Sequence, residues 1–145
     1  ILDIYTKNGQ DQYSLISSGS IQTNKKNDIS SRLLEIHNDM SELINIYKPD
    51  VAAIEQIFYF KNAKTIIPVS EARGVILLNF KMKEIPVFEY TPLVVKQTMT
   101  GYGRATKDDI KQTIQLILEQ DKIPKLDDAS DAIAIALCHA RFCEV

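Results

Sequence analysis

The sequence predicts an α/β fold in which one mixed central sheet is flanked by helices. Stretches typical of strands and of helices follow each other in the order β-β-α-β-α-β-α-α-α, which is typical of helices packed on a sheet. A short, wholly apolar run, Val51–Ile54, is typical of a strand buried on both faces. The chain has 145 residues, of which 45% are hydrophobic and 25% charged, enough for about one domain with one core. We therefore expect residues 1–145 to form a single domain.

Four segments are predicted to be strands. Asn8-Gly9 joins the first two, and this dipeptide between β-rich runs is the strongest short-range signal of a hairpin. The third is the apolar run, and the fourth ends where Thr91-Pro92 begins a helix. The predicted strands are Ile1–Tyr5, Gln12–Gln22, Val51–Ile54 and Pro86–Tyr90.

Five segments are predicted to be helices from their periodicity and their cap residues. The first begins after the candidate caps Asp28 or Ser30 and ends before Pro49. Gly74 inside the second predicts close packing against a neighbouring element. Thr106 caps the fourth, and two acids follow where the helix dipole favours them. The predicted helices are Ile29–Tyr47, Val69–Phe80, Thr91–Gly101, Thr106–Glu119 and Asp127–Phe142.

Charge is unevenly distributed along the chain. The net charge of −2 argues against a generally polycationic binder. Residues 58–107 nevertheless carry eight Lys or Arg and three Glu, a local charge of +5, between segments of −3 and −4. This segment is typical of a phosphate-binding surface or, more often, of an ordinary solvated surface. No apolar run approaches the ~20 residues needed to cross a bilayer, so we expect no membrane segment and a cytoplasmic protein.

Three carboxylates are the candidate catalytic residues. Glu55 follows the apolar strand, at the edge where α/β sheets bind ligands, although a position at the rim in water fits equally well. Asp128 and Asp131 share one helix face, and Asp128 also suits a helix cap. Asp131 lies in an otherwise apolar stretch, where an acid needs a partner such as a metal ion.

The chemistry of these acids points to a hard divalent cation. Carboxylate oxygens without a set of Cys and His ligands favour Mg²⁺ or Mn²⁺. Two such ions held by a carboxylate cluster suit in-line phosphodiester hydrolysis. The acids and the basic segment together therefore predict a nuclease.

Other motifs carry weaker signals. Cys138, His139 and Cys143 do not make a four-ligand zinc site by themselves. The Gly101–Arg104 turn lacks the setting of a nucleotide-binding loop, but a role beside a phosphate backbone stays open. The aromatic run Phe58–Phe60 is more often core than functional, yet three adjacent rings cannot all point inward, which suits base stacking by one of them.

Several blocks, in order along nearly the whole chain, carry a resemblance to a known family. They are Gly19–Thr23, Ala53–Phe58, Lys61–Ala63, Glu71–Gly74, Pro86–Tyr90, Val95–Thr98, Gly101–Gly103 and Asp128–Ala136. Together they resemble the RuvC family of Holliday-junction resolvases. The resemblance implies a ribonuclease H-like fold.

The resemblance also implies a Mg²⁺-dependent homodimer that nicks two opposed strands of a four-way DNA junction in recombination and repair. A two-fold dimer matches a two-fold junction. Two Mg²⁺ ions are expected in the complete site, with Mn²⁺ as a substitute, and branch-migration proteins are implied partners. The metal-binding acids implied by position are Glu55, Asp128 and Asp131. The implied DNA-binding residues are Phe58, which wedges into the junction centre, and Lys96 and Lys107, which lie near the scissile phosphate.

The sequence departs from the family at its start. The family's fourth acid comes from a first strand with a Gly-[Ile/Leu]-Asp-Pro-Gly block, and this block is absent here. Ile1–Tyr5 resembles the second strand, so we expect the N-terminal strand to be missing and do not assign Asp3 to the site. An incomplete ligand set predicts that this 145-residue chain by itself is weakly active or inactive.

Two other functions remain open from the sequence. One is a non-catalytic module that binds junction DNA through its basic surface and Phe58, with structural carboxylates. The other is a related ribonuclease H-like nuclease with a different nucleic-acid substrate, against which the positions of Phe58, Lys96 and Lys107 argue through the resemblance.

Overall fold

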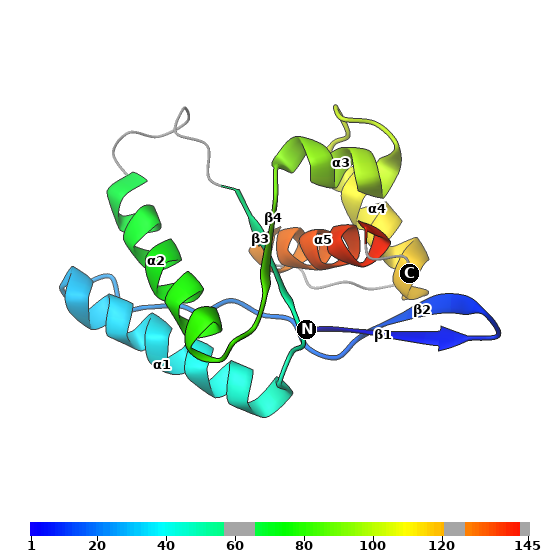
Figure 1. Cartoon of the computed structure of the whole chain (residues 1–145). Coiled ribbons are helices and arrows are strands. Elements are labelled where there is room, and N and C mark those ends of the chain that lie inside the picture. Colours follow the sequence, from blue (N-terminus) through cyan, green and yellow to red (C-terminus); the bar gives the residue numbers. More distant parts are fainter. Residues whose placement is uncertain (57–65, 121–126, 143–145) are drawn as a thin grey trace. The chain divides into compact units, whose positions relative to one another are not determined.

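The computed structural model describes residues 1–56, 66–120 and 127–142, which contain four strands and five helices (Figure 1). The chain divides into two compact units. The first unit comprises Ile1–Ser20, Ala53–Gln56 and Phe88–Val145. The second comprises Ile21–Ala52 and Ile57–Val87. The single nuclease domain expected from the sequence therefore stays a prediction.

A β-hairpin begins the first unit. Strands β1 (Leu2–Lys7) and β2 (Gln10–Leu15) pair antiparallel, from Leu2 opposite Leu15 to Lys7 opposite Gln10. Asn8 and Gly9 between them have φ values of 55° and 76°, the left-handed pair that a tight hairpin turn requires. The predicted hairpin is confirmed, but the strand predicted over Gln12–Gln22 is too long. It ends at Leu15, opposite Leu2 at the start of β1, and beyond it the Ile16 N–H donates to the Ile1 carbonyl at 3.0 Å.

Strands β3 (Ala52–Glu55) and β4 (Val87–Tyr90) form a second two-stranded sheet. The Ala52 N–H donates to the Pro86 carbonyl at 2.9 Å and the Gln56 N–H to the Tyr90 carbonyl at 2.8 Å. The residue numbers of the donors and of the acceptors increase in the same direction, so the strands run parallel. The two pairs β1–β2 and β3–β4 are the sheets of the described residues, and the single mixed central sheet stays a prediction.

The burial expected for β3 is only partly present. Ala52 is buried, but Ala53 and Ile54 are half-buried and the preceding Val51 is 39% exposed. The prediction of a strand buried on both faces is therefore wrong. An apolar run indicates that its residues can be buried, but it does not specify which elements pack on each face of the strand.

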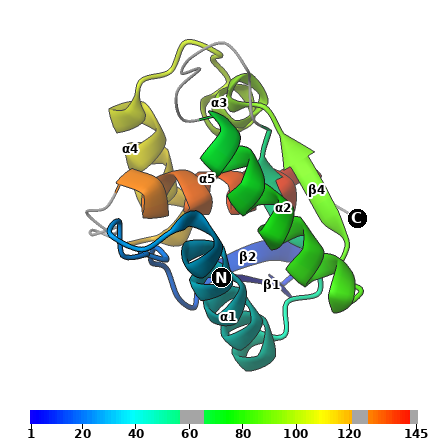
Figure 2. The ribbon, with the colours of Figure 1, turned by 90° about the vertical axis from the view of Figure 1, so that its left-hand side faces the viewer.

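The core of the first unit lies among three helices, α3 (Pro92–Thr100), α4 (Lys107–Leu118) and α5 (Asp127–Phe142). Helix α5 packs against α3, α4 and β1, and α4 also contacts β2 (Figures 1 and 2). Leu2, Tyr13 and Leu15 of the hairpin pack on this cluster. The buried members of the cluster are Val95, Met99, Ile110, Ile114, Leu118, Ile133, Ala134, Leu137 and Cys138.

The caps of α3 and α4 confirm the predicted boundaries. The Thr91 hydroxyl accepts from the Val94 N–H at 3.1 Å, and Gly101 ends α3 with φ 77°. At the start of α4, the Thr106 hydroxyl accepts from the Asp109 N–H at 3.2 Å, and the Asp109 carboxylate accepts from the Thr106 N–H at 2.8 Å. This reciprocal capping box fixes the first turn of α4.

The second unit contains two helices, α1 (Ile29–Tyr47) and α2 (Ile66–Met82), which lie side by side (Figures 1 and 2). Asp28 caps α1 by accepting from the Ser31 N–H at 3.0 Å, as predicted. Gly74 is not at a close contact, because nothing lies within 4 Å of the position a Cβ would take. The packing predicted from this glycine is wrong. In the described parts of the chain, every helix is too short or too polar to span a membrane.

Candidate active site

The candidate active site is a pocket of about 200 Å³ in the first unit. We call it the Glu55–Asp131 pocket. Its floor is apolar, with Val95, Ile110 and Ala134 among the lining residues. Its polar and charged lining residues are Glu55, Lys96, Thr106, Lys107 and Asp131. Four of the six site residues expected from the sequence therefore meet in one pocket.

Each of these side chains is placed by a different element. Glu55 is the last residue of β3 and Lys96 lies on α3. Lys107 is the first residue of α4, directly after the Thr106 cap, and Asp131 lies on α5. Chain segments distant in sequence thus supply two acids and two bases to one pocket.

The position of Glu55 is fixed by a short series of hydrogen bonds. The Gln56 N–H, next to Glu55, donates to the Tyr90 carbonyl at 2.8 Å. The Tyr90 hydroxyl is 2.7 Å from Nδ1 of His139 on α5, and His139 is buried. The His139 ring also packs on Phe88, with ring centroids 4.4 Å apart. Because α5 also carries Asp131, these contacts tie the end of β3 to the helix that holds the second acid.

The two acids in the pocket influence each other. Desolvation in the pocket raises the pKa of the Glu55 carboxyl above its ordinary value, and the negative charge of Asp131 raises it further. Two carboxylates that repel each other in this way favour a bound cation. Lys107 supplies one positive charge, since its Nζ lies 4.0 Å from Asp131 Oδ2.

Asp131 differs from the sequence expectation in its surroundings. It was expected to be an acid within an apolar helix, but its side chain is 54% exposed and its charged partner is Lys107. Ala134 and Ile135, three and four residues further on, share its side of α5 and line the same pocket, whereas Ile133 is buried in the core.

An ion-pair chain beside the pocket was missed by the sequence analysis. Asp127 Oδ1 accepts from Lys111 Nζ at 2.8 Å, and Asp127 Oδ2 lies 3.5 Å from Lys107 Nζ. The hydrogen bond from Lys111 and the charge of Lys107 lower the pKa of Asp127. The four-residue spacing of Lys107 and Lys111 places both on one face of α4, but it does not indicate that this face meets Asp127 of α5.

Two of the six predicted site residues, Asp128 and Phe58, are not among the described lining residues of the pocket. Asp128 is exposed on α5 and is not among the lining residues of the pocket. Phe58 lies outside the described residues. Asp3, which the sequence analysis left unassigned, is exposed in β1 and does not line the pocket. Within residues 1–56, 66–120 and 127–142, no three His, Cys, Asp or Glu are arranged to hold one metal ion.

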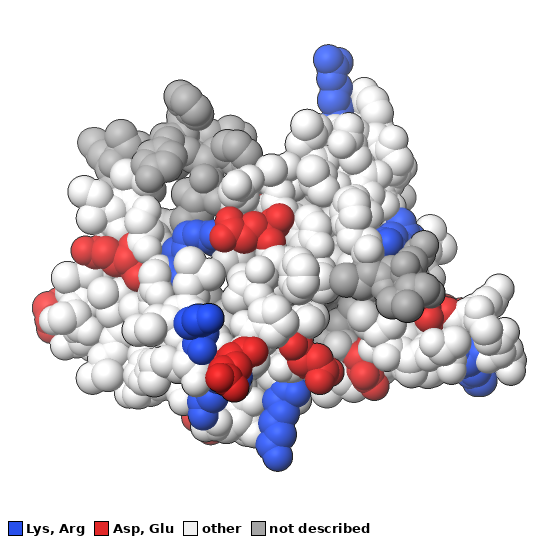
Figure 3. Space-filling view, viewed as in Figure 1, with Lys and Arg blue, Asp and Glu red and all other residues white. Residues whose placement is uncertain are grey.

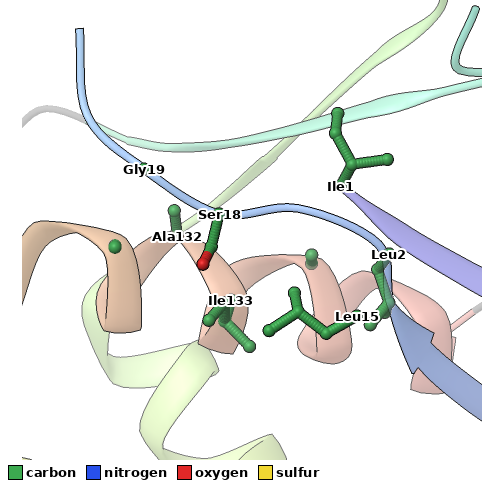
Figure 4. Close-up of a pocket in the computed structure, with 9 residues that line it drawn as sticks. Ile1, Leu2, Leu15, Ser18, Gly19, Ala132 and Ile133 are labelled. Atoms are coloured by element: carbon green, nitrogen blue, oxygen red, sulfur yellow. The ribbon is translucent and has the colours of Figure 1, made fainter. Parts of the chain in front are cut away.

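A second pocket, of about 100 Å³, lies on another face of α5. Leu15 and Ile133 point toward each other in it (Figure 4). Ala129, Ala132 and Ala136 of α5 complete the wall, and the lining has no acid or base. Asp131 and Ala134 face the first pocket and these alanines face the second, so one helix separates an ionic site from an apolar one.

Comparison with known proteins identifies the family. The model of the family described as "Crossover junction endodeoxyribonuclease RuvC" matches residues 4–139. The chain belongs to the RuvC family. It is 48% identical over 130 residues to the RuvC of Petrotoga mobilis, covering 90% of this chain and 80% of that protein. It is 45% identical over 136 residues to the RuvC of Caldicellulosiruptor saccharolyticus, covering 94% and 81%.

Solved RuvC structures have the same fold as this chain. The structure of Thermus thermophilus RuvC superposes with a TM-score of 0.88 at 27% identity, covering 97% of this chain and 84% of that one. T. thermophilus RuvC in complex with a Holliday junction substrate superposes with a TM-score of 0.87 at 27% identity, covering 96% and 84%. The α/β fold expected from the sequence is therefore confirmed as that of RuvC.

The residues of the Glu55–Asp131 pocket suit a hard divalent cation. Mg²⁺ is usually bound through one or two carboxylates and keeps several waters. Glu55 and Asp131 supply two carboxylates to one pocket, and the pKa of Glu55 is raised by desolvation first and then by the charge of Asp131, a repulsion that a cation relieves. The donor set thus fits Mg²⁺ or Mn²⁺ and contains none of the thiolates that favour zinc.

Proposed function

We propose that this RuvC-family chain is a structure-selective endonuclease that resolves four-way DNA junctions by paired, metal-dependent phosphodiester hydrolysis during recombination and repair. One observation carries the proposal: Glu55, Asp131, Lys96 and Lys107 line one pocket of a RuvC fold. The relatives named crossover junction endodeoxyribonuclease and the complex of T. thermophilus RuvC with a Holliday junction support the substrate.

In this proposal, Glu55 and Asp131 would hold Mg²⁺, with Mn²⁺ as a substitute, and Asp128 would supply a further ligand to a two-ion site. Ions bound there would supply the chemistry of water activation and of leaving-oxygen stabilisation. Lys107, 4.0 Å from Asp131, and Lys96 on the same pocket balance the charge of the scissile phosphate.

The lysines also orient the substrate before hydrolysis. The capping box at Thr106 fixes the first turn of α4, so the Lys107 backbone is held in place while its side chain stays 64% exposed. Because its backbone is already positioned, such a lysine needs little further ordering when it binds a phosphate. Phe58 is proposed as the aromatic residue that wedges into the centre of the junction.

The proposed active form is a homodimer in the cytoplasm that works with branch-migration proteins. Exposed apolar side chains on α1 and α2 support a protein interface on the second unit. Leu34 is 58% exposed, Ile46 60% and Leu78 55%, and burial of such side chains against a second copy of the chain would favour association. A dimer places two pockets on two opposed strands.

The experiment that tests the proposal is an assay of binding and cleavage on one gel. The chain is mixed with a labelled four-way junction in Mg²⁺ and, separately, in Ca²⁺, with linear duplex as the control substrate. We expect binding in both ions and no nicks in Ca²⁺; in Mg²⁺ we expect paired nicks that are weak or absent, because the ligand set is incomplete. Failure of the wild-type chain to bind the junction in either ion would refute the proposed substrate.

Three substitutions distinguish an enzyme from a binding module. Glu55→Gln and Asp128→Asn are expected to abolish cleavage while binding in Ca²⁺ persists, and Asp131→Asn is expected to behave in the same way. Asp11→Asn is the matched control, because Asp11 is an exposed acid of the hairpin away from the pocket. If these three variants leave junction binding intact and change only stability, the non-catalytic junction-binding module is the better description.

The two pocket lysines have a separate readout. Lys96→Ala and Lys107→Ala are each expected to reduce the slope of log affinity against log salt by about one, as one lost phosphate contact does. An unchanged slope would place these lysines away from the DNA backbone.

A further inference from the structure

The loop between α3 and α4, residues 101–106, has a conformation fixed by its own hydrogen bonds. Gly101 has φ 77°, and its N–H donates to the Gln97 carbonyl at 2.8 Å. The Tyr102 N–H donates to the Thr100 hydroxyl at 3.1 Å, and the Ala105 N–H donates to the Tyr102 carbonyl at 3.1 Å. These hydrogen bonds extend from the end of α3 to Ala105, directly before the Thr106 cap of α4.

Packing fixes the same loop from beneath. A Cβ at Gly103 would lie 2.6 Å from Leu93 Cδ1, so the backbone passes directly over α3. Ala105 is buried, with 3% exposure. The loop therefore has an inner side made of Gly103 and Ala105.

The outer side of the loop carries an aromatic and a basic residue. Tyr102 is 59% exposed, and Arg104 is also exposed. In the part of the chain that the structure describes, no carboxylate lies within ion-pair distance of Arg104. Figure 3 shows a basic side chain standing clear of the surface over this loop, at the top of the view, with no acidic side chain beside it. A rigid loop thus displays a free guanidinium and an exposed ring.

The loop lies beside the Glu55–Asp131 pocket. Lys96, in the middle of α3, and Thr106, the N-cap of α4, both line the pocket, and the loop connects the two helices. Arg104 is two residues from Thr106, so their Cα atoms are at most about 7 Å apart. Tyr102 lies two residues beyond Thr100, the last residue of α3, and Thr100 is about one helical turn beyond Lys96. A strand bound in the pocket therefore has this loop as an adjacent surface.

We propose that Tyr102 and Arg104 form a second DNA-contact surface, which holds the strand where it leaves the Glu55–Asp131 pocket. Arg104 pairs with a backbone phosphate, whose oxygens match the guanidinium fork. The Tyr102 ring packs against a neighbouring base or sugar. This inference rests on the proposed function, because it takes junction DNA to be the occupant of the pocket.

The first test measures the phosphate contact. Affinity of the full chain for the four-way junction is measured in Ca²⁺ over a series of salt concentrations. Arg104→Gln is expected to weaken binding by about tenfold at low salt and to reduce the salt slope by about one. Arg104→Lys is expected to keep the slope and lose part of the affinity, since it retains charge and loses the fork. Lys7→Gln, an exposed base on the hairpin, is the matched control and is expected to change neither quantity.

The second test reports the aromatic contact directly. The chain contains no Trp, so Tyr102→Trp introduces a single fluorophore at the loop. We expect its emission to be quenched when the junction binds, because the ring stacks on the nucleic acid. Tyr5→Trp on β1, at a similarly exposed tyrosine, is expected to show no quenching. Tyr102→Phe is expected to bind as the wild type does, and Tyr102→Ala about fivefold more weakly or worse.

The outcomes separate this inference from the proposed function. Loss of junction binding by the wild-type chain would refute the proposed function itself. The proposed loop contact alone would be overturned if the wild-type chain binds the junction normally, the salt slope of Arg104→Gln equals that of the wild type, and the emission of Tyr102→Trp is not quenched by the junction. Thermal unfolding of each variant identifies a folding defect. If Arg104→Gln is destabilised, the Tyr102→Trp fluorescence measurement decides whether the loop contacts DNA, because this variant keeps a large ring at the exposed position.

Discussion

Replacement of Ile114 by alanine is expected to remove a large part of the stability of the first unit. Ile114 lies on α4 with 0% exposure, in the cluster formed by α3, α4 and α5. The substitution removes three carbon groups, worth about 2.4 kcal/mol at about 0.8 kcal/mol each. A residual cavity of roughly 40–60 Å³ adds about 1–1.5 kcal/mol. We therefore expect a loss of about 3.5 kcal/mol, against a total of about 5–15 kcal/mol for a typical domain.

The measurement is urea unfolding followed by circular dichroism, which gives the free energy of unfolding from the midpoint and the slope. Leu116→Ala is the matched control, because Leu116 lies on the same helix and is 79% exposed. Its free energy of unfolding is expected to stay within about 0.5 kcal/mol of the wild type. A loss below about 1 kcal/mol for Ile114→Ala, or equal losses for the two variants, would show that α4 does not pack as described.

Three further predictions concern caps, pH and ion pairs. Thr106→Ala removes the cap of α4 and is expected to lower the free energy of unfolding by about 1 kcal/mol in the same urea assay; an unchanged value would contradict the capping role. Burial lowers the pKa of His139, so the unfolded chain binds the proton first as pH falls. Stability is therefore expected to decrease below about pH 6.5, and in thermal melts His139→Gln should lose this dependence while His37→Gln keeps it. Asp127→Asn is expected to return the raised pKa of Lys111 to its ordinary range in an NMR titration; a pKa that stays raised would exclude Asp127 as its main partner.

Helices were predictable from the sequence because their signals are local. The caps at Asp28, Thr91 and Thr106 and the left-handed Gly101 each act within one turn of chain. The hairpin turn at Asn8-Gly9 is local in the same sense. The boundaries of these elements therefore agree with the periodicity and the cap residues.

The strands and the packing were less predictable because their partners are distant in sequence. The length of β2 depends on the acceptors that Ile1 and β1 offer. The exposure of Val51 and the open space around Gly74 depend on what packs there. A pattern in one segment does not contain this information.

The candidate site was partly predictable. Glu55 and Asp131 stood out as acids at a strand end and in an apolar helix, and they share a pocket in the structure. The lysines of the pocket were found only through the family resemblance. The ion pair of Asp127 with Lys111 depends on how α4 and α5 pack against each other, which no local pattern specifies.

The packing of the hairpin on the last helix has a consequence for the order of folding. The turn at Asn8-Gly9 allows β1 and β2 to close on the microsecond timescale, and they are synthesised well before α5. Leu2 and Leu15, however, pack on a cluster that includes Leu137 of α5. An isolated hairpin is only marginally stable in water, so β1 and β2 gain their stable packing only when α5, which is synthesised more than 100 residues later, is available. Vectorial synthesis therefore gives this core a late closing step, in which α5 joins a hairpin made much earlier.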